Sequence, residues 1–272
     1  MFGLASAACW GASDFSGGVA SKRGSSYSVV VASQVIGIVF LGVLVLPLPE
    51  ALPPVESLLW AAAAGISGGF GLVAFYRALA DGQMGVVAPV GGIVGALVPV
   101  IAAFFIDGFP GIVTLVGFGM AMAAVWLVSS GDAEMSIQLR DLGLPVVAGL
   151  GFGGFLLLIS RASETALLWP LVAARAASLV TLSVVGVVLD QLQMPDRKQL
   201  PVIALTGIFD TGGNALYVLA ARAGRLDIAA VLGSIYPGGT VLLAWLILKE
   251  RLTRLQWLGV VTTLVAIALI AL

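Results

Sequence analysis

The sequence predicts an all-α membrane protein that crosses the bilayer ten times, as two inverted repeats of five helices each. Three observations lead to this expectation: composition, the length of the apolar runs and an internal repeat. Of the 272 residues, 60% are hydrophobic and only 10% are charged, and the mean hydropathy is +1.12. An ordinary soluble domain is about 25% charged. The chain therefore belongs in a lipid environment, with short connections between its spans.

Charged and Pro/Gly-rich breaks divide the chain into segments long enough to span a membrane. A helix needs about 20 apolar residues to cross a hydrocarbon core roughly 30 Å thick. The segments are long apolar runs, unlike the alternating ten-residue strands of a membrane β-barrel. Ten helices are expected, over residues 2–20, 28–47, 57–80, 84–106, 110–129, 142–162, 168–189, 200–221, 226–248 and 252–272.

One sequence offset relates the two halves of the chain. The longest polar connection, residues 130–141, separates a first repeat over 1–129 from a second over 142–272. A shift of 142 residues pairs glycines from the first span to the last without a gap. The pairs are Gly11/Gly153, Gly65/Gly207, Gly71/Gly213, Gly82/Gly224, Gly91/Gly233 and Gly117/Gly259. Five spans per half is an odd number, so the second half enters the membrane from the opposite side, as in many secondary transporters.

Two segments also resemble a known family. SIYPGGTVLLAWLILKERLTRLQWLGVVTTLVAIALI, residues 234–270, is similar to the end of an EamA domain of the drug/metabolite transporter superfamily, and CWGASDFSGGVASKRG, residues 9–24, resembles the start of one. The resemblance covers nearly the whole chain as two copies. It implies ten helices and the transport of small metabolites or drugs, often outward. We also expect a multi-pass protein of the cell membrane, most simply a bacterial plasma membrane, that is a monomer or weak homodimer. The first copy departs from the pattern at Asp107-Gly108, which stand opposite Lys249-Glu250.

The polar residues inside the predicted spans are the candidate substrate-binding residues. An aspartate at the centre of a helix costs about 2.5–3.5 kcal/mol on insertion scales, so it normally faces the bundle interior or a wet cavity. Asp210 lies in the middle of the eighth span, and Asn214 and Tyr217 follow at helical spacing. We expect these three side chains to line a cavity; the alternative is a carboxyl that only pairs helices.

Further charges lie in the first and seventh spans. Asp14 follows Trp10 by one turn and belongs either to the cavity or to the membrane interface. Arg175 always carries its charge, so it needs a carboxylate, a carbonyl or water, and we expect it to pair with Asp210 or Asp14. At the offset of 142 these charges have no counterparts, since Gly68 stands opposite Asp210. Repeated helices with unrepeated charges suit an asymmetric ligand.

Pro- and Gly-rich stretches interrupt the fourth and ninth spans. Gly91 and Gly92 lie between Pro89 and Pro99, and Tyr236 precedes Pro237 in the matching span. Such interruptions at corresponding positions of two halves are the best sequence indication of a transport site, although glycines also allow close helix packing. We expect both spans to be broken here and Tyr236, Gly91 and Gly92 to contact substrate. Tyr76, at the end of the third span, is expected to be an interfacial anchor.

Composition excludes several other functions. With no histidine, Ser67 of the GISGG stretch has no imidazole base, and no multi-histidine metal site can form. A P-loop is missing, a single cysteine gives no metal cluster, and a net charge of −1 offers no nucleic-acid surface. We expect no cofactor, no metal and no enzymatic activity. The remaining alternatives to a transporter are an acid-base enzyme using intramembrane carboxylates, or a channel.

The predicted function is secondary active transport of a small polar or amphipathic metabolite by alternating access, with a proton as the coupling ion carried by Asp210. Two carboxylates and one arginine would suit a zwitterion or an amine. The side of the membrane on which the termini lie stays open. The family resemblance implies the cytoplasm, whereas the excess of Lys and Arg in the odd-numbered loops implies the outside.

Overall fold

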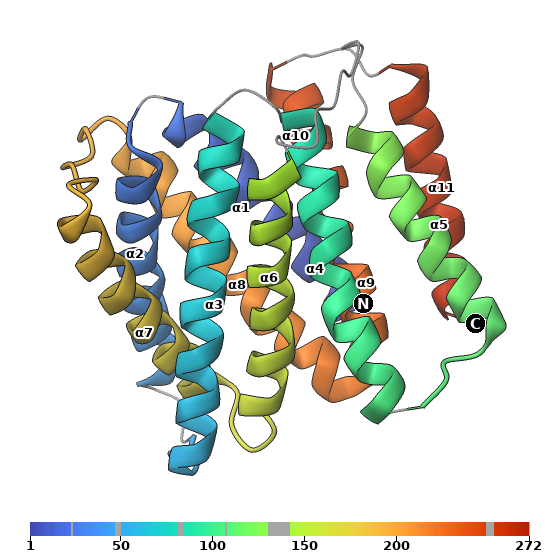
Figure 1. Cartoon of the computed structure of the whole chain (residues 1–272), viewed down its shortest axis with the longest axis horizontal. Helices are drawn as coiled ribbons and strands as arrows, with labels where there is room; N and C mark the ends of the chain where they lie inside the picture. Colours follow the sequence, from blue (N-terminus) through green and yellow to red (C-terminus); the bar gives the residue numbers. More distant parts are fainter. Residues whose placement is uncertain are drawn as a thin grey trace.

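A computed structural model describes residues 1–22, 24–46, 50–80, 84–106, 108–129, 142–248 and 253–271. The expected linker and the Lys249-Glu250 pair lie outside these ranges. Within them the chain forms helices α1 to α11, and α9 and α10 together occupy the ninth predicted span (Figure 1). Their bounds are α1 Phe2–Ser21, α2 Ser26–Val45, α3 Val55–Ala80, α4 Met84–Ile106, α5 Ile112–Ser129, α6 Gly143–Ala162, α7 Leu168–Val188, α8 Leu200–Ala223, α9 Leu226–Gly233, α10 Tyr236–Leu248 and α11 Arg254–Ala271.

The outer surface of the bundle is apolar, as contact with lipid requires. Among the described helices, α2, α3, α6, α7 and α8 are long and apolar enough to cross a membrane, and α4 and α5 contain shorter apolar stretches. Large aliphatic and aromatic side chains point outward, including Val39 and Val43 of α2, Phe105 of α4, and Val180 of α7. Exposed apolar surface on this scale marks a membrane-embedded face. The protein is therefore a polytopic helical membrane protein.

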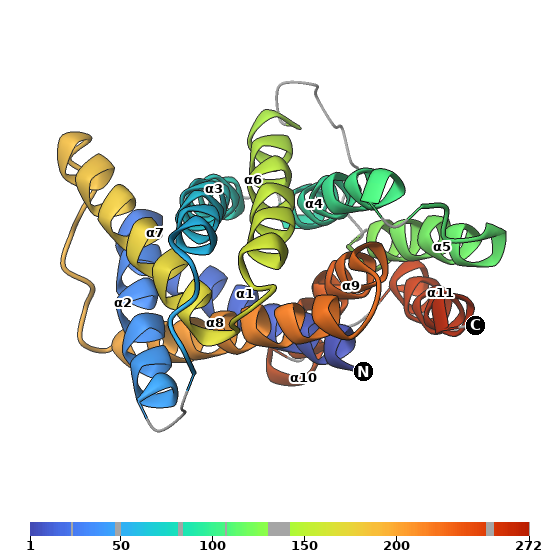
Figure 2. The same ribbon diagram turned by 90° about the horizontal axis from the view of Figure 1, so that it is seen from below.

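The helices pack as two inverted repeats. The most extensive contacts of the first-half helix α3 are with α6 and α7, and its counterpart α8 packs in the same way against α1 and α2. The α4 helix crosses α6, as α9 and α10 cross α1. Self-related pairs occupy the two ends of the bundle, α2 with α7 and α5 with α11 (Figure 2). This exchange of partners is the pattern that a pseudo-two-fold axis in the membrane plane produces.

Glycines at the offset of 142 make equivalent close approaches. A Cβ atom on Gly65 of α3 would lie 1.9 Å from the carbonyl oxygen of Ala174 in α7. On Gly207 of α8 it would lie 2.5 Å from the carbonyl oxygen of Ser33 in α2. Only a residue without a side chain lets backbones meet so closely. The repeated glycines of the sequence thus mark repeated contacts between the two halves.

The ninth span is broken, as its sequence predicts. Helix α9 ends at Gly233 and α10 begins at Tyr236, which places Pro237 in the first turn of α10, where its missing N–H leaves no hydrogen bond unmade. The expected matching break in the fourth span is wrong, because α4 is continuous. The position opposite Pro237 is Gly95 (237 − 142 = 95), which keeps its N–H. Pro89 and Pro99 therefore do not stand where the break of the second half lies.

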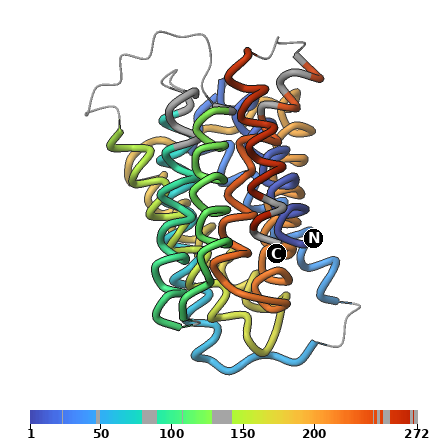
Figure 3. Tube along the Cα trace, turned by 90° about the vertical axis from the view of Figure 1, so that its right-hand side faces the viewer, coloured from blue at the N-terminus to red at the C-terminus, as the bar shows by residue number. Residues whose placement is uncertain are grey.

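Successive spans run in opposite directions through the bundle. The carboxyl ends of α1, α3, α5, α7 and α10 lie toward the upper edge of Figure 1. Both chain ends lie in the lower half of the molecule, as the view in Figure 3 also shows. An even number of spans produces this arrangement.

Candidate functional site

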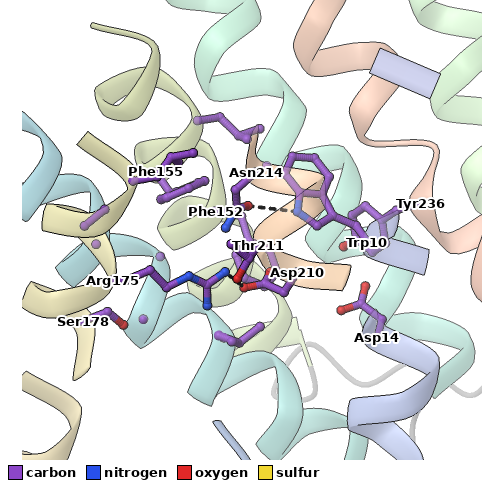
Figure 4. Close-up of a pocket in the computed structure, with 18 of the residues that line it drawn as sticks. Trp10, Asp14, Phe152, Phe155, Arg175, Ser178, Asp210, Thr211, Asn214 and Tyr236 are labelled. Carbon is purple, nitrogen blue, oxygen red and sulfur yellow. Dashed lines mark hydrogen bonds and ion pairs between the residues drawn. The ribbon is translucent and has the colours of Figure 1, made fainter. Parts of the chain in front are cut away.

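A cavity lies at the centre of the bundle, where the two halves meet. About 890 Å³ of space between the atoms belongs to it, including the part that opens to solvent. Side chains of α1, α2, α3, α4, α6, α7, α8 and the break between α9 and α10 line it (Figure 4). The lining includes eight of the nine predicted binding residues: Trp10, Asp14, Gly91, Gly92, Arg175, Asp210, Asn214 and Tyr236.

An ion pair joins α7 and α8 at one side of this cavity. The Arg175 guanidinium donates one hydrogen bond to the carboxylate of Asp210 and another to the side-chain carbonyl of Gln34 in α2. Arg175 is 5% exposed and the Asp210 side chain 18% exposed. The Gln34 amide in turn donates to Ser178 Oγ at 3.2 Å. Of the two partners expected for Arg175, the structure selects Asp210.

Gly37 of α2 leaves the room that this ion pair needs. A Cβ atom at Gly37 would come within 3.2 Å of Arg175 Cζ and 2.5 Å of Thr211 Oγ1. Thr211 follows Asp210, and its hydroxyl donates to the carbonyl of Gly207 at 2.6 Å. Helices from both halves thus hold the guanidinium in place.

Trp10 and Asn214 connect α1 with α8 across the cavity wall. The indole Nε1 of Trp10 donates to Asn214 Oδ1 at 3.0 Å (Figure 4). Tyr217 lies behind this contact and does not line the cavity. Its ring packs 5.8 Å from the Trp10 ring, and its hydroxyl donates to the Leu156 carbonyl at 3.1 Å. Tyr217 shares a helix face with Asp210 but lies seven residues, about 10.5 Å, further along the axis, where Trp10 and Leu156 pack around it.

Asp14 also faces the cavity, but it lies away from the Arg175–Asp210 ion pair (Figure 4). It is half-buried, and it makes no hydrogen bond or ion pair with any other residue in the described part of the chain. Close to it, the Tyr76 hydroxyl packs against Gly17, one turn after Asp14 on α1. The interfacial position expected for Tyr76 is wrong: its side chain is 0% exposed, because α3 runs on to Ala80 and turns this ring toward α1.

Gly92 of α4 faces the break in the ninth span, and Gly91 faces Phe75 of α3. A Cβ atom on Gly92 would lie 3.4 Å from the Ser234 carbonyl oxygen and 3.7 Å from the Tyr236 hydroxyl. On Gly91 it would lie 3.5 Å from the Phe75 ring. The Tyr236 hydroxyl is buried and has no hydrogen-bond partner among the described residues. A hydroxyl group with no hydrogen-bond partner among the described residues therefore lies in the cavity lining beside the α9–α10 break.

Several lining residues were not predicted from the sequence. Gln34 accepts a hydrogen bond from Arg175, and Ser178 accepts one from Gln34. Neither residue carries a charge, so nothing distinguished them within apolar spans. Phe152 stands opposite Trp10 at the repeat offset (152 − 10 = 142), and the repeat could have identified it.

Ser67, the serine of GISGG, donates its hydroxyl to the Gly151 carbonyl at 3.0 Å and joins α3 to α6.

Two inverted five-helix halves around a shared cavity define a polytopic membrane protein of the transporter type. The chain belongs to the EamA-like transporter family, which matches residues 1–130 and 142–272, and so to the drug/metabolite transporter superfamily. It is 28% identical over 138 residues to an uncharacterized protein, MJ1333.1, of Methanocaldococcus jannaschii; the match covers 93% of that protein and 48% of this chain. A solved structure titled only "Crystal structure of protein" shares the fold with a TM-score of 0.79 at 14% identity, over 98% of this chain and 94% of that one.

Proposed function

We propose that this protein is a secondary active transporter that exports a small amphipathic metabolite by alternating access, as a monomer or weak homodimer of the bacterial plasma membrane. The observation that carries the proposal is the central cavity with its buried Arg175–Asp210 ion pair, lined by helices of both halves. A charged pair is expensive inside a membrane and usually marks a substrate or ion pathway. Substrate would bind between the halves, near Asp210, Asn214 and Trp10.

The inverted packing supports alternation between two openings. Since α3 contacts α6 and α7 much as α8 contacts α1 and α2, each half can adopt the conformation of the other at similar energetic cost. Exchange of the two conformations would close the cavity on one side and open it on the other. Substrate then crosses without a continuous pore, which separates this mechanism from a channel.

Asp14 is the better candidate for a proton carrier than Asp210. The charge of Asp210 is compensated by Arg175, whereas Asp14 faces the cavity without a charged partner among the described residues. Asp14 can therefore take up and release a proton as the cavity changes sides without breaking an ion pair. Transport in proteoliposomes should accelerate when the side toward which the substrate moves is made the more acidic; indifference of the rate to the gradient would remove proton coupling.

A thermal-shift screen tests the proposed site. Purified protein in detergent is heated with a panel of metabolites, and the screen is repeated with Asp210→Asn and with Glu164→Gln, a matched change at an exposed surface ion pair. A true substrate should raise the melting temperature of the unmutated protein and of Glu164→Gln only. Counterflow of that compound in proteoliposomes then tests transport. A ligand that stabilises Asp210→Asn equally would place the site elsewhere.

A further inference from the structure

The charges that line the cavity do not balance. Among the described residues, the lining carries two carboxylates, Asp14 and Asp210, and one guanidinium, Arg175, so its formal charge is −1. Arg175 and Asp210 neutralise each other and Gln34 takes a further guanidinium N–H. Asp14 is left as a negative charge without a protein counter-ion in the described part. A carboxylate in such surroundings needs a cation or a proton.

Two tyrosines pack against α1 on either side of Asp14. One turn before it, a Cβ atom at Gly11 would lie 2.8 Å from the backbone oxygen of Tyr236, and one turn after it Gly17 meets the Tyr76 hydroxyl. Both hydroxyls are buried and lack a hydrogen-bond partner among the described residues. Tyr236 is 7% exposed and lines the cavity itself. The oxygen of a phenol can accept a hydrogen bond from a cation that also contacts the carboxylate.

The rest of the lining is suited to the apolar body of a ligand. Trp10 and Tyr236 present aromatic rings near Asp14, and aromatic faces attract cations. Leu72, Phe152 and Phe155 cover the wall toward α3 and α6. Hydrophobic and aromatic walls with a few placed polar groups are typical of small-molecule sites.

We propose that Asp14, Tyr236 and Trp10 form a subsite for the ammonium group of a substrate that has an apolar body and one net positive charge. This inference rests on the proposed transport function and names its substrate class. A zwitterion is disfavoured because its carboxylate would have to displace Asp210 or Gln34 from Arg175. An anion would meet a cavity that is already negative.

Matched ligands of one body and different charge test the proposal. The binding of 2-phenylethylamine, phenylalanine and 3-phenylpropionate is measured by calorimetry on the detergent-solubilised protein at about pH 7, and repeated with tryptamine, tryptophan and indole-3-propionate. The amine of each series should bind at least tenfold more tightly than the amino acid, and the acid most weakly. Equal or tighter binding of either amino acid or acid, or binding of neither amine, overturns the proposal.

Substitutions then locate the subsite. Asp14→Asn should weaken amine binding at least tenfold, and Asp14→Glu should retain most of it. The control Asp190→Asn changes a carboxylate to an amide in the exposed α7–α8 loop, where the positive φ of 52° also suits asparagine, and should leave binding unchanged. Unaltered amine affinity in Asp14→Asn contradicts the assignment. If thermal unfolding shows that Asp14→Asn is misfolded, Tyr236→Phe replaces it as the test. This variant should bind the amines more weakly than the unmutated protein does and should still bind them more tightly than the amino acids and acids. Unaltered amine affinity in Tyr236→Phe would then contradict the assignment.

The two proposals fail in different ways. If the amines bind in the expected order but do not cross proteoliposome membranes faster than in protein-free vesicles, the ammonium subsite stands and transport is wrong. If an amino acid or acid is transported without any preference for the amines in binding, transport stands and the ammonium subsite is wrong.

Discussion

Arg175 and Asp210 meet inside the membrane because neither charge can be left alone there. Each comes from a different helix of the second half, and Gln34 of the first half completes the contact. Removing one member of a buried pair leaves the other uncompensated, at a cost of about 3–5 kcal/mol. The pair therefore contributes both to the packing of α2, α7 and α8 and to the polarity of the cavity.

A charge-swap experiment separates this pair from chance proximity. Arg175→Asp and Asp210→Arg, made singly, should each lower the free energy of unfolding by about 3–5 kcal/mol and abolish transport. The double variant should recover at least half of the lost stability and measurable transport, because the two effects share one interaction. Unfolding in detergent titrations and flux in proteoliposomes are the measurements. Simple addition of the two losses would show that the pair is not coupled.

Residues with formal charge could be found from the sequence because charge is rare in this chain. Asp14, Arg175 and Asp210 stood out in apolar segments, and all three line the cavity. Gln34 could not be identified in this way, since one uncharged amide in a span has no single interpretation. Tyr76 was misplaced because the sequence shows where a helix ends but not which neighbour covers its last turns.

At the scale of helices, a glutamate outside the spans fixes the start of α7. Glu50 accepts the backbone N–H groups of Leu167, Leu168 and Trp169 at 2.6, 2.8 and 3.1 Å. These amides have no partner within the helix, and a carboxylate also favours the positive end of the helix dipole. The loop before α3 is thus fastened to the loop before α7.

The pseudo-equivalent contact on the opposite face is weaker. Position 50 corresponds to position 192 (50 + 142 = 192), and there the Gln191 carbonyl accepts from Ser25 Oγ at 2.9 Å, while Ser28 Oγ accepts the N–H of Gln193 at 2.8 Å. Hydrogen bonds to a charged group are roughly twice as strong as neutral ones. Related loops therefore make hydrogen bonds on both faces of the bundle, and the bonds to the charged Glu50 are the stronger ones.

Substitution of Glu50 tests this asymmetry. Glu50→Ala should lower the free energy of unfolding by about 1–2 kcal/mol, the usual effect of losing a helix cap, and Glu50→Gln should lose less. Glu56→Ala, in the first turn of α3 on the exposed surface, is the control and should change stability by less than about 0.5 kcal/mol. Melting temperatures in detergent measure the difference. Equal effects of the two alanine variants would contradict a capping role for Glu50.

Close packing of α3 on α7 is tested by adding one methyl group. Gly65→Ala would place Cβ 1.9 Å from a backbone oxygen, and overpacking of this kind costs about 1–3 kcal/mol or more. Gly42→Ala is the matched control in α2, with nothing within 4 Å, and should be stabilising by up to about 1 kcal/mol because alanine favours the helix. Melting temperatures should move in opposite directions. A neutral Gly65→Ala would mean that α3 and α7 are further apart.

For the whole molecule, the sequence predicted the number of spans and their arrangement in two inverted halves. Glycines at one offset were a sufficient signal because close helix contacts tolerate no side chain, and contacts of the same kind recur in both halves. What the offset could not show is where the halves differ. The broken ninth span and the continuous α4 follow from the placement of one proline, Pro237, and only the backbone reveals its effect.

Thiol labelling from each side of the membrane tests the central claim most directly, that one aqueous cavity between the halves opens to both sides in turn. In a Cys9→Ala background, Ser178→Cys places a thiol in the cavity lining, and Val180→Cys places one on the outer, lipid-facing surface of α7. A membrane-impermeant maleimide should label the Ser178→Cys variant in both right-side-out and inside-out vesicles and leave the Val180→Cys variant unlabelled. Labelling of the cavity thiol from one side only, or from neither, would contradict alternating access.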